Sequence, residues 1–530
     1  MPKSFRARLG GCAFAALAMA WVQTAQAAPA TPAPEKEGSL YLQCDGEPNN
    51  MTGGEAAARL LGAVTLLGLF APRVESADSS KRKLAADGVA ACSGLIDGEK
   101  KEGNPERRVR LLLGRAVHQI EAKDYAAAVA DVQRARTEAD TAGLLADPYF
   151  SRSQSRAFDL VEATALHRMG KLEEARVAAL RSTGSGSRSL FGLVMPPYLF
   201  ASADETPGER DFLRRRTRTA LAVGGMEAER LEELGQFASA AVIRDALVAH
   251  DAASSTKVTS SVWMAEAAVT NAMAGNMERA ATLAADARAN FEKRKAEGKP
   301  EKDPAEFVEL MDLYGIVRMT SEGDAAGARR LFAARSEWVA ASFGCVVEMA
   351  RRLRQGAPEA DLIGGLARDP ATLWSDRAKA RTAVALASDS DNQTLFALLP
   401  AYHRAAAYEA VSKQVWRTDK SQILLKDKNP EKRSSRMETL YLYAVSPGIA
   451  LEAYTMHAAL LARSRGHQGF VITPLFVSGL VGAMIQTGNR GDAGMPEPLF
   501  NDAAEVIAEL SPVFPDPETL KARKAARTKR

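Results

Sequence analysis

The pattern of apolar and polar positions at 110–136 predicts two short helices joined by a tight turn at Lys123. A small residue, Ala116, stands seven positions before Lys123. Tyr125 follows two positions after the turn residue, and Ala128 five positions after it. Two helices that cross at close range need small side chains at the crossing and a large side chain beside the turn. This stretch therefore predicts a helical hairpin.

The same three-point pattern recurs four more times along the chain, each time around a glycine. These turn residues are Gly170, Gly235, Gly275 and Gly323. Each has Ala or Ile seven positions before it, Leu, Phe, Met or Ala two positions after it, and Ala five positions after it. Glycine ends a helix in the left-handed conformation without the steric penalty of a side chain. One such match is expected by chance in an alanine-rich helical chain, whereas five with one spacing indicate a repeat.

The stretches Lys-Asp-Tyr-Ala-Ala-Ala-Val-Ala-Asp at 123–131 and Gly-Lys-Leu-Glu-Glu-Ala-Arg at 170–176 resemble the tetratricopeptide-repeat (TPR) family. That resemblance implies a mainly α protein, an α-solenoid of TPR-like helical hairpins that stack because one hairpin cannot bury its apolar face alone. Two features depart from the family. The turns are 47, 65, 40 and 48 residues apart, whereas the family repeats about every 34 residues. Bulky residues expected in the first helices are also replaced, for instance by Gln119 and Asn271. The repeats are therefore degenerate, with extra segments between them.

The rest of the chain divides by composition into parts on either side of these repeats. We predict a signal peptide at 1–28, a linker at 29–37, an N-terminal helical cap at 38–105, the TPR-like repeats at 106–365, further helices and a basic loop at 366–436, a small C-terminal α+β unit at 437–515 and a basic disordered tail at 516–530. Within the α+β unit we expect a helix, two strands and a last helix, at 451–465, 470–472, 475–484 and 501–507. Asn501 or Asp502 would cap the last helix.

The first 28 residues have the three parts of a secretory signal. These parts are a positive start (Lys3, Arg6 and Arg8), an apolar stretch (12–22) and a small-residue cleavage site (Ala25 to Ala27). The apolar stretch is too short for a permanent membrane anchor. We therefore expect a periplasmic protein, secreted with cleavage near Ala27.

Cleavage of the signal peptide lowers the net charge of the chain. The whole chain carries 69 basic and 65 acidic residues, and the loss of three basic residues leaves 66 against 65. A nearly neutral protein lacks the basic surface that nucleic-acid binding requires, so we expect no nucleic-acid partner.

Cysteine usage agrees with export. Cys12 leaves with the signal, Cys44 and Cys92 flank the N-terminal region, and Cys345 stands alone. In an oxidising compartment Cys44 and Cys92 are the natural disulfide pair, which closes a loop worth about 4 kcal/mol in the chain-entropy model. The alternative is that both are buried free thiols. Cys345 is expected to be a small buried apolar residue within a helix.

Two segments raise an alternative in which the protein touches a membrane. The run at 60–71 is the most apolar of the mature chain, although twelve apolar residues are more typical of a buried helix. The tail at 521–530 contains six basic residues and no acid, and each charge near an anionic bilayer would gain about 1 kcal/mol. An envelope-associated structural protein with peripheral membrane contact therefore remains the first alternative.

No motif commits the chain to a reaction, so we expect a protein that is not an enzyme and has no cofactor. Ser254 and Lys257, with Ser390-Asp391-Asn392 downstream, imitate two motifs of serine enzymes that bind penicillin. The third motif would need a cation where Gln486 stands. The histidines are dispersed without a chelating pair, so no metal site is predicted. A serine enzyme that uses Ser254 and Lys257 is the second alternative.

The resemblance to TPR proteins also predicts a binding face, because the first helix of each TPR hairpin lines the concave side of the stack. The residues expected there are His167, Arg168, Glu229, Glu232 and Glu233. They suit a protein or peptide segment held by polar contacts, and a solvated helix face is the alternative. The sequence thus favours an exported non-catalytic scaffold for a protein or peptide partner. It leaves the oligomeric state open.

Overall fold

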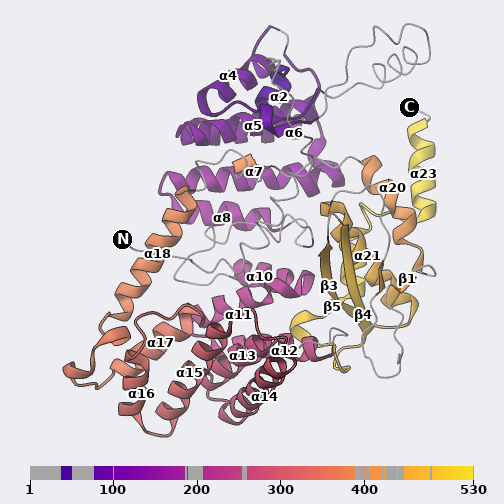
Figure 1. Ribbon diagram of the computed structural model, residues 1–530. Coiled ribbons are helices and arrows are strands. Elements are labelled where there is room, and N and C mark those ends of the chain that lie inside the picture. The colour runs from indigo at the N-terminus through magenta and orange to yellow at the C-terminus, as the bar shows by residue number, and fades with distance from the viewer. Residues whose placement is uncertain are drawn as a thin grey trace.

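The protein is mainly helical, as predicted. The computed structural model describes residues 38–49, 77–99, 101–184, 188, 207–253, 260–387, 395–396, 399, 405–418, 422–423, 438–439, 447–477 and 480–528. These residues form nineteen α-helices, a three-stranded sheet and a two-stranded sheet (Figure 1). The signal peptide, the linker, the apolar run at 60–71 and the segment that holds Ser254 and Lys257 lie outside the described residues, as does Ser390-Asp391-Asn392.

All five expected turns lie between consecutive helices. The pairs are α5 (Pro105–Glu121) with α6 (Tyr125–Thr141), α7 (Pro148–Arg168) with α8 (Leu172–Ser182), α11 (Gly224–Glu233) with α12 (Phe237–Ala253), α13 (Ser261–Met273) with α14 (Met277–Ala296), and α15 (Pro304–Ser321) with α16 (Ala325–Ala333). The four turn glycines have φ between 71° and 90°, and Lys123 has φ 63°. A Cβ at any of these glycines would meet nothing within 4 Å. The backbone conformation, not a lack of space, therefore favours glycine there.

The residues that the pattern placed at the helix crossings, nine alanines and one isoleucine, are all buried. Each is at most 1% exposed: Ala116, Ala128, Ala163, Ala175, Ala228, Ala240, Ala268, Ala280, Ile316 and Ala328. Alanine leaves room for the backbones to approach, and so the two helices of each hairpin pack closely. Asp124 and Asp324, which follow two of the turns, accept hydrogen bonds from the backbone of the next helix.

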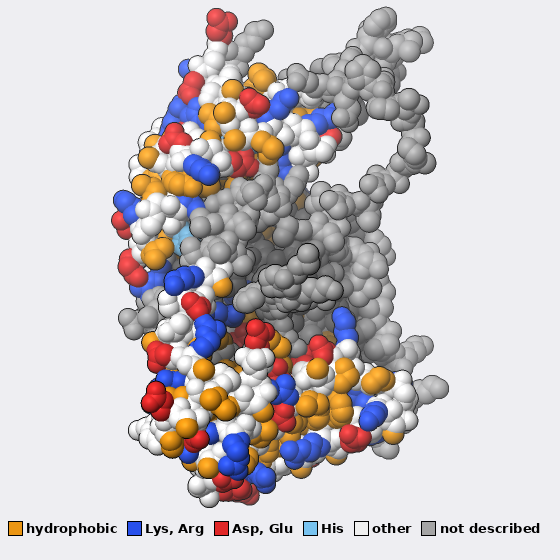
Figure 2. Space-filling model, turned by 60° about the vertical axis from the view of Figure 1, so that its left-hand side comes forward, with side chains coloured by type: hydrophobic (Ala, Val, Ile, Leu, Met, Phe, Trp, Pro, Cys, Tyr) orange, Lys and Arg blue, Asp and Glu red, His pale blue; other side chains and the backbone are white. Residues whose placement is uncertain are grey.

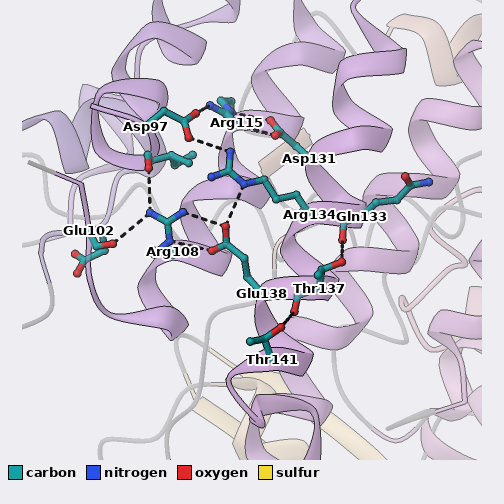
Figure 3. A network of polar contacts seen from close by, with 11 residues as sticks. Asp97, Glu102, Arg108, Arg115, Asp131, Gln133, Arg134, Thr137, Glu138 and Thr141 are labelled. Carbon is teal, nitrogen blue, oxygen red and sulfur yellow. Dashed lines mark hydrogen bonds and ion pairs between the residues drawn. The ribbon is translucent and has the colours of Figure 1, made fainter. Parts of the chain in front are cut away.

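The N-terminal cap is closed by a disulfide and is joined to the first hairpin by charges. Its helices are α2 (Leu40–Asp45) and α4 (Ala85–Ile96), and the predicted disulfide between Cys44 and Cys92 is present. A network of ion pairs joins α4, α5 and α6 (Figure 3). Its members are Arg108, Arg115 and Arg134 with Asp97, Asp131 and Glu138.

After the last hairpin the chain turns back along the helices that precede it. α17 (Phe343–Arg354) is followed by Gly356 at φ 68° and by a short 3₁₀ helix, Glu359–Asp361. α18 (Pro370–Ala387) then runs along the side of the molecule, from α17 toward the level of α7 (Figure 1). Leu395, Phe396 and Leu399 join the apolar core of the N-terminal helices.

In its described residues, the C-terminal part contains four helices, a three-stranded antiparallel sheet and a two-stranded antiparallel sheet. Its elements are α20 (Ala405–Val415), β1 (Gln422–Ile423), β2 (Glu438–Thr439), α21 (Pro447–Ser464), β3 (Gly469–Val477), β4 (Leu480–Gly488), β5 (Asn501–Asp502), α22 (Ala503–Leu510) and α23 (Pro517–Thr528). The strand order is β4-β3-β5, with Phe470 opposite Thr487 in β4 and opposite Asn501 in β5.

Three predictions for this part need correction. Residues 475–477 continue the first strand, and the second strand begins at Leu480. Asp502 caps α22 by accepting hydrogen bonds from two backbone amides, but α22 is not the last helix. The expected disordered tail forms α23, because Leu520 is buried and Arg523 donates a hydrogen bond to the hydroxyl of Tyr149 at 3.1 Å.

The C-terminal part packs against the middle of the helical hairpins. Arg152 of α7 donates two hydrogen bonds to Glu452 of α21, at 3.2 and 2.8 Å. The imidazole of His250, on α12, lies 3.1 Å from the hydroxyl of Thr473, on β3. Asn501 donates a hydrogen bond to the carbonyl of Arg218, on α10 (Pro207–Thr219). The last quarter of the chain therefore contacts α7, α10 and α12.

Candidate functional site

A cleft of about 720 Å³ lies where the end of α11, the length of α17 and the start of α18 meet. Side chains of both charges and one large aromatic ring line it. The charged and aromatic side chains of the lining include those of Glu232, Glu233, Arg351, Arg354, Asp369 and Trp374. The volume is in the range of sites that hold a small ligand or a few side chains of a partner.

The cleft exists because α17 packs directly on the backbone of α11. A Cβ at Gly344 would lie 2.3 Å from the carbonyl carbon of Glu232, so only glycine permits this approach. Ser342 caps the start of α17 through a hydrogen bond from the amide of Cys345. Cys345 itself is buried, which raises the pKa of its thiol well above the ordinary value. It is a packing residue, as the sequence predicted.

The last turn of α17 supplies the cations of the cleft. Arg351 makes two hydrogen bonds to Glu348, at 2.7 and 2.8 Å, yet its side chain remains 59% exposed. The hydrogen bonds from Arg351 lower the pKa of Glu348 below its ordinary value. Arg354 turns toward the carbonyl oxygen of Leu366. Basic side chains at this position also interact favourably with the negative end of the helix dipole.

The opposite wall is the first turn of α18. Asp369 accepts a hydrogen bond from the amide of Ala371 at 3.0 Å, and this caps the helix. Trp374 meets the ring of Phe343 edge-on, with the ring centroids 4.7 Å apart. The indole is thus fixed by contact with α17 while it lines the cleft. An aromatic wall of this kind offers apolar contact at a low entropy cost.

Glu232 forms part of the base of the cleft, and its carboxylate is fully engaged within the protein. Arg244 donates to both of its oxygens, at 3.2 and 3.3 Å, and the hydroxyl of Thr270 donates at 2.6 Å. Glu232 is 1% exposed and Arg244 is 4% exposed. The prediction that Glu232 faces a partner from the surface is therefore wrong for its carboxylate. An acid this well enclosed is stable only with its cation in place.

Arg244 also donates a hydrogen bond to a second carboxylate, that of Glu266 on α13, at 2.8 Å. Burial raises the pKa of Glu266 to about 7, in spite of the opposing effect of Arg244. The charges of Glu229 and Glu232 act in the same direction as burial. The carboxylates of Glu229, Glu232 and Glu266 therefore all raise the pKa of Arg244, while Arg377 also acts on Glu229.

The structure brings together only some of the residues predicted for partner binding. Glu233 is half-buried and lines the cleft, and the exposed Glu229 lies one turn earlier on the same helix. His167 and Arg168 are at the end of α7, in another hairpin, and are not among the residues that line the cleft. The guanidinium of Arg168 lies 2.9 Å from the imidazole of His167. The predicted binding face therefore divides between two places.

Sequence reasoning missed the side chains from α17 and α18. The repeat pattern ends before these helices, so no concave face could be assigned to them. A local signal was nevertheless present. Three arginines at 351–354 stand shortly before Gly356, as expected at a helix end, and Asp369 precedes Pro370, as expected at a helix start.

The described surface limits the chemistry that can be assigned. Among the described residues, no group of three or more His, Cys, Asp or Glu side chains could hold a metal ion. No helix in the same part of the chain is long and apolar enough to cross a membrane. On the face in Figure 2, the coloured acidic and basic side chains are intermixed, without a large area of one sign. The cleft can therefore offer polar contacts and aromatic packing to a ligand.

Comparisons of the chain with protein-family models, with curated proteins and with solved structures find no match. The assignment of a function therefore rests on the cleft and on the chain pattern.

Proposed function

We propose that the protein is an exported, non-catalytic scaffold that holds a segment of a protein or peptide partner in the cleft between α11, α17 and α18. The observation that carries this proposal is the composition of the cleft. An exposed guanidinium (Arg351), carboxylates (Glu233 and Asp369) and an indole (Trp374) share one volume of about 720 Å³. Polypeptide segments carry charges of both signs and apolar groups, and each of these finds a counterpart there.

The proposal includes a TPR-like solenoid as the architecture that presents the cleft. Five hairpins share one three-point pattern, their turn residues share one backbone conformation, and their crossing residues are buried. Repeats of this kind form binding surfaces by stacking. In this chain the α18 helix and the C-terminal part lie against the hairpins, so the binding surface would be confined to the cleft and would not extend along the whole stack.

Export to the periplasm is the part of the proposal that the cysteines support. The disulfide between Cys44 and Cys92 is compatible with an oxidising compartment. The charge balance of the mature chain gives no reason to expect a nucleic-acid partner.

Crosslinking of a tagged mature protein in cells tests the proposal, with identification of the crosslinked partner. We expect a discrete exported partner whose yield falls at least about tenfold in Arg351→Glu and in Trp374→Ala, because each change removes one element of recognition. Arg318→Glu is the matched control, since Arg318 is 55% exposed on α15 and pairs only loosely with Glu322, at 3.9 Å. A partner that is lost equally in the control, or retained in both cleft variants, would contradict the proposal. Recovery of lipid alone would favour the envelope-associated alternative.

A further inference from the structure

His250, near the end of α12, lies at the contact between the hairpins and the C-terminal sheet. The residue is 5% exposed, and its Nε2 lies 3.1 Å from the hydroxyl oxygen of Thr473 on β3. Its Nδ1 is also buried and has no hydrogen-bond partner among the described residues. In either tautomer, one ring nitrogen of His250 therefore lacks a partner.

The surroundings of this imidazole are apolar. Leu247, one turn before His250 on the same face of α12, belongs to one buried cluster with Val471 of β3 and Leu499 of the 3₁₀ helix η12 (Glu497–Leu499). Val471 and Thr473 are two positions apart, so they point to the same face of β3. Burial lowers the pKa of His250 below its ordinary value of 6.5. The imidazole is therefore neutral at neutral pH and stands beside an apolar contact.

Among the described residues, no charged group compensates a positive charge on His250. β3 contains no charged residue. The charged residues of α12 and of the elements packed on it are Arg244, Asp245 and Asp251 of α12, Glu227, Glu229, Arg230, Glu232 and Glu233 of α11, Glu266 of α13, and Glu497 of η12. α10, which packs on β3, adds Glu209, Asp211 and arginines at 210, 214, 215, 216 and 218. None of these groups shifts the pKa of His250, because burial is the only cause of its shift.

Protonation of His250 would make its Nδ1 a charged donor inside this contact. A buried charge and an unpaired donor both cost free energy, which is recovered when water reaches the ring. Separation of α12 from β3 admits that water, so the open joint binds a proton more tightly than the closed joint. The stability of the closed joint is therefore complete above about pH 6.5 and decreases as the pH falls through that value.

From this geometry we infer that His250 is a pH-sensitive latch between α12 and β3. The neutral imidazole holds the two elements together, and its protonation opens this side of the joint. The other side is joined by Arg152 of α7 and Glu452 of α21, a pair without a histidine, so the C-terminal part stays attached to the hairpins. The latch does not depend on the cleft or on a partner, and it can be tested on the protein alone.

Thiol labelling at position 471 tests the latch. A local probe is needed because Glu266, with a pKa of about 7, changes the global stability in the opposite direction. Val471 is 2% exposed, so the thiol of Val471→Cys reacts with dithiodipyridine once α12 and β3 separate. Labelling rates of the full mature chain are measured at about pH 7.5 and about pH 5, and each is divided by the rate of the urea-unfolded protein at the same pH.

Between these two pH values we expect the normalised rate at this thiol to rise by about threefold to thirtyfold. Thirtyfold is the limit for an imidazole that has its ordinary pKa in the open joint. The buried Cys345 should stay unlabelled at both pH values and so report that the hairpins remain folded. His250→Gln, which can keep the hydrogen bond to Thr473 but cannot be protonated, should abolish the rise. His167→Gln is the matched control, because His167 lies on α7, in another hairpin, and should leave the rise unchanged.

An equal rate at the two pH values in Val471→Cys would overturn the latch. A rise that persists in His250→Gln, or that is matched by labelling of Cys345, would overturn it too, since neither comes from this imidazole. If Val471→Cys itself opens the joint at both pH values, Leu499→Cys in the same apolar cluster replaces it, with the same outcomes. If His250→Gln exposes Cys345, Thr473→Val decides. That variant should raise the rate at about pH 7.5 and keep the further rise at about pH 5; an unchanged rate at the higher pH would count against the latch.

Discussion

Two regions of the molecule are built around an arginine that bridges two acids, and they differ in their charge balance. In the N-terminal region, Arg115 binds Asp131 through two hydrogen bonds of 2.7 Å and Asp97 through one of 2.7 Å. Beside the cleft, Arg244 binds Glu232 through two hydrogen bonds and Glu266 through one. In both places, one guanidinium donates two hydrogen bonds to one carboxylate and one hydrogen bond to another.

The surroundings of the two arginines are not the same. Around Arg115 the network in Figure 3 continues through Arg134, Glu138 and Arg108, so three cations face three anions. Around Arg244 the carboxylates of Glu229, Glu232 and Glu266 all act on one guanidinium. Perturbed pKa values occur in both regions, because structural ion-pair networks shift pKa values as functional sites do. The difference is one of position, since Glu232 belongs both to the cluster around Arg244 and to the lining of the cleft.

Removal of the central arginine should give the largest difference between the two regions. Arg244→Met leaves Glu232 buried without its cation, and we expect a loss of about 3–5 kcal/mol in the free energy of unfolding. Arg115→Met should fall toward the lower end of that range, about 3 kcal/mol, because it leaves Asp131 buried at 6% exposure without its cation, whereas Asp97 is 48% exposed and can be hydrated. Urea unfolding of both variants measures the difference. Equal losses would remove the distinction between the two regions.

The pH dependence of stability should have opposite signs in the two regions. The pKa of Glu266 is raised from 4.5 to about 7 in the folded protein, so its contribution to stability is fully present below pH 4.5 and is lost as the pH rises through about 7. For Asp97, burial raises the pKa, but hydrogen bonds from Arg115 and Arg134 lower it overall. Its contribution is present above its unfolded pKa and is lost as the pH falls through the lower folded value.

Glu266→Gln should therefore stabilise the protein at pH 8, by on the order of 2 kcal/mol, and reduce the loss of stability between about pH 5 and 8. Asp97→Asn should reduce stability at neutral pH and weaken the decline below about pH 4. Thermal unfolding of the wild type and of both variants across this range provides the measurement. A decrease in the stability of Glu266→Gln at pH 8 would show that the ion pair with Arg244 outweighs burial.

The smallest effects on stability are expected at the exposed arginines of each region. Arg134 is 38% exposed and Arg351 is 59% exposed, so replacement of either by alanine should change the free energy of unfolding by less than about 1 kcal/mol. Partner binding should be measured on the same two variants, because it distinguishes the cleft from the N-terminal network. Only Arg351→Ala should weaken binding, because only Arg351 lines the cleft. Weaker binding in Arg134→Ala would place the partner elsewhere.

Local chemistry explains which parts of this fold could be predicted. Each turn is specified within about a dozen residues, by a glycine that accepts positive φ and an alanine that allows a close crossing, as at Gly275 and Ala280. The disulfide could be paired because only Cys44 and Cys92 lie near each other in the N-terminal region.

The cleft could not be predicted because its side chains come from separate elements. Glu232 has the spacing of a surface residue, and its burial depends on Arg244 in the next helix and on Thr270 in the next hairpin. No periodicity within α11 contains that information. The strand boundary at 477 was missed because the break was placed at Thr473-Pro474, whereas Ser478-Gly479, a dipeptide typical of turns, stands between β3 and β4.

The position of the C-terminal part has a consequence for the order of folding. Each hairpin makes contacts between residues close in sequence, so the hairpins can form while the chain is still being synthesised. The contact between Arg152 and Glu452 joins residues 300 positions apart, and Arg188 reaches Asn501 and Glu509 across more than 300. These pairs must wait for the end of the chain, and until then Arg152 and Arg188 have no counter-charge from this part. The last step of folding is therefore the one that brings the hairpins and the C-terminal part into a single body.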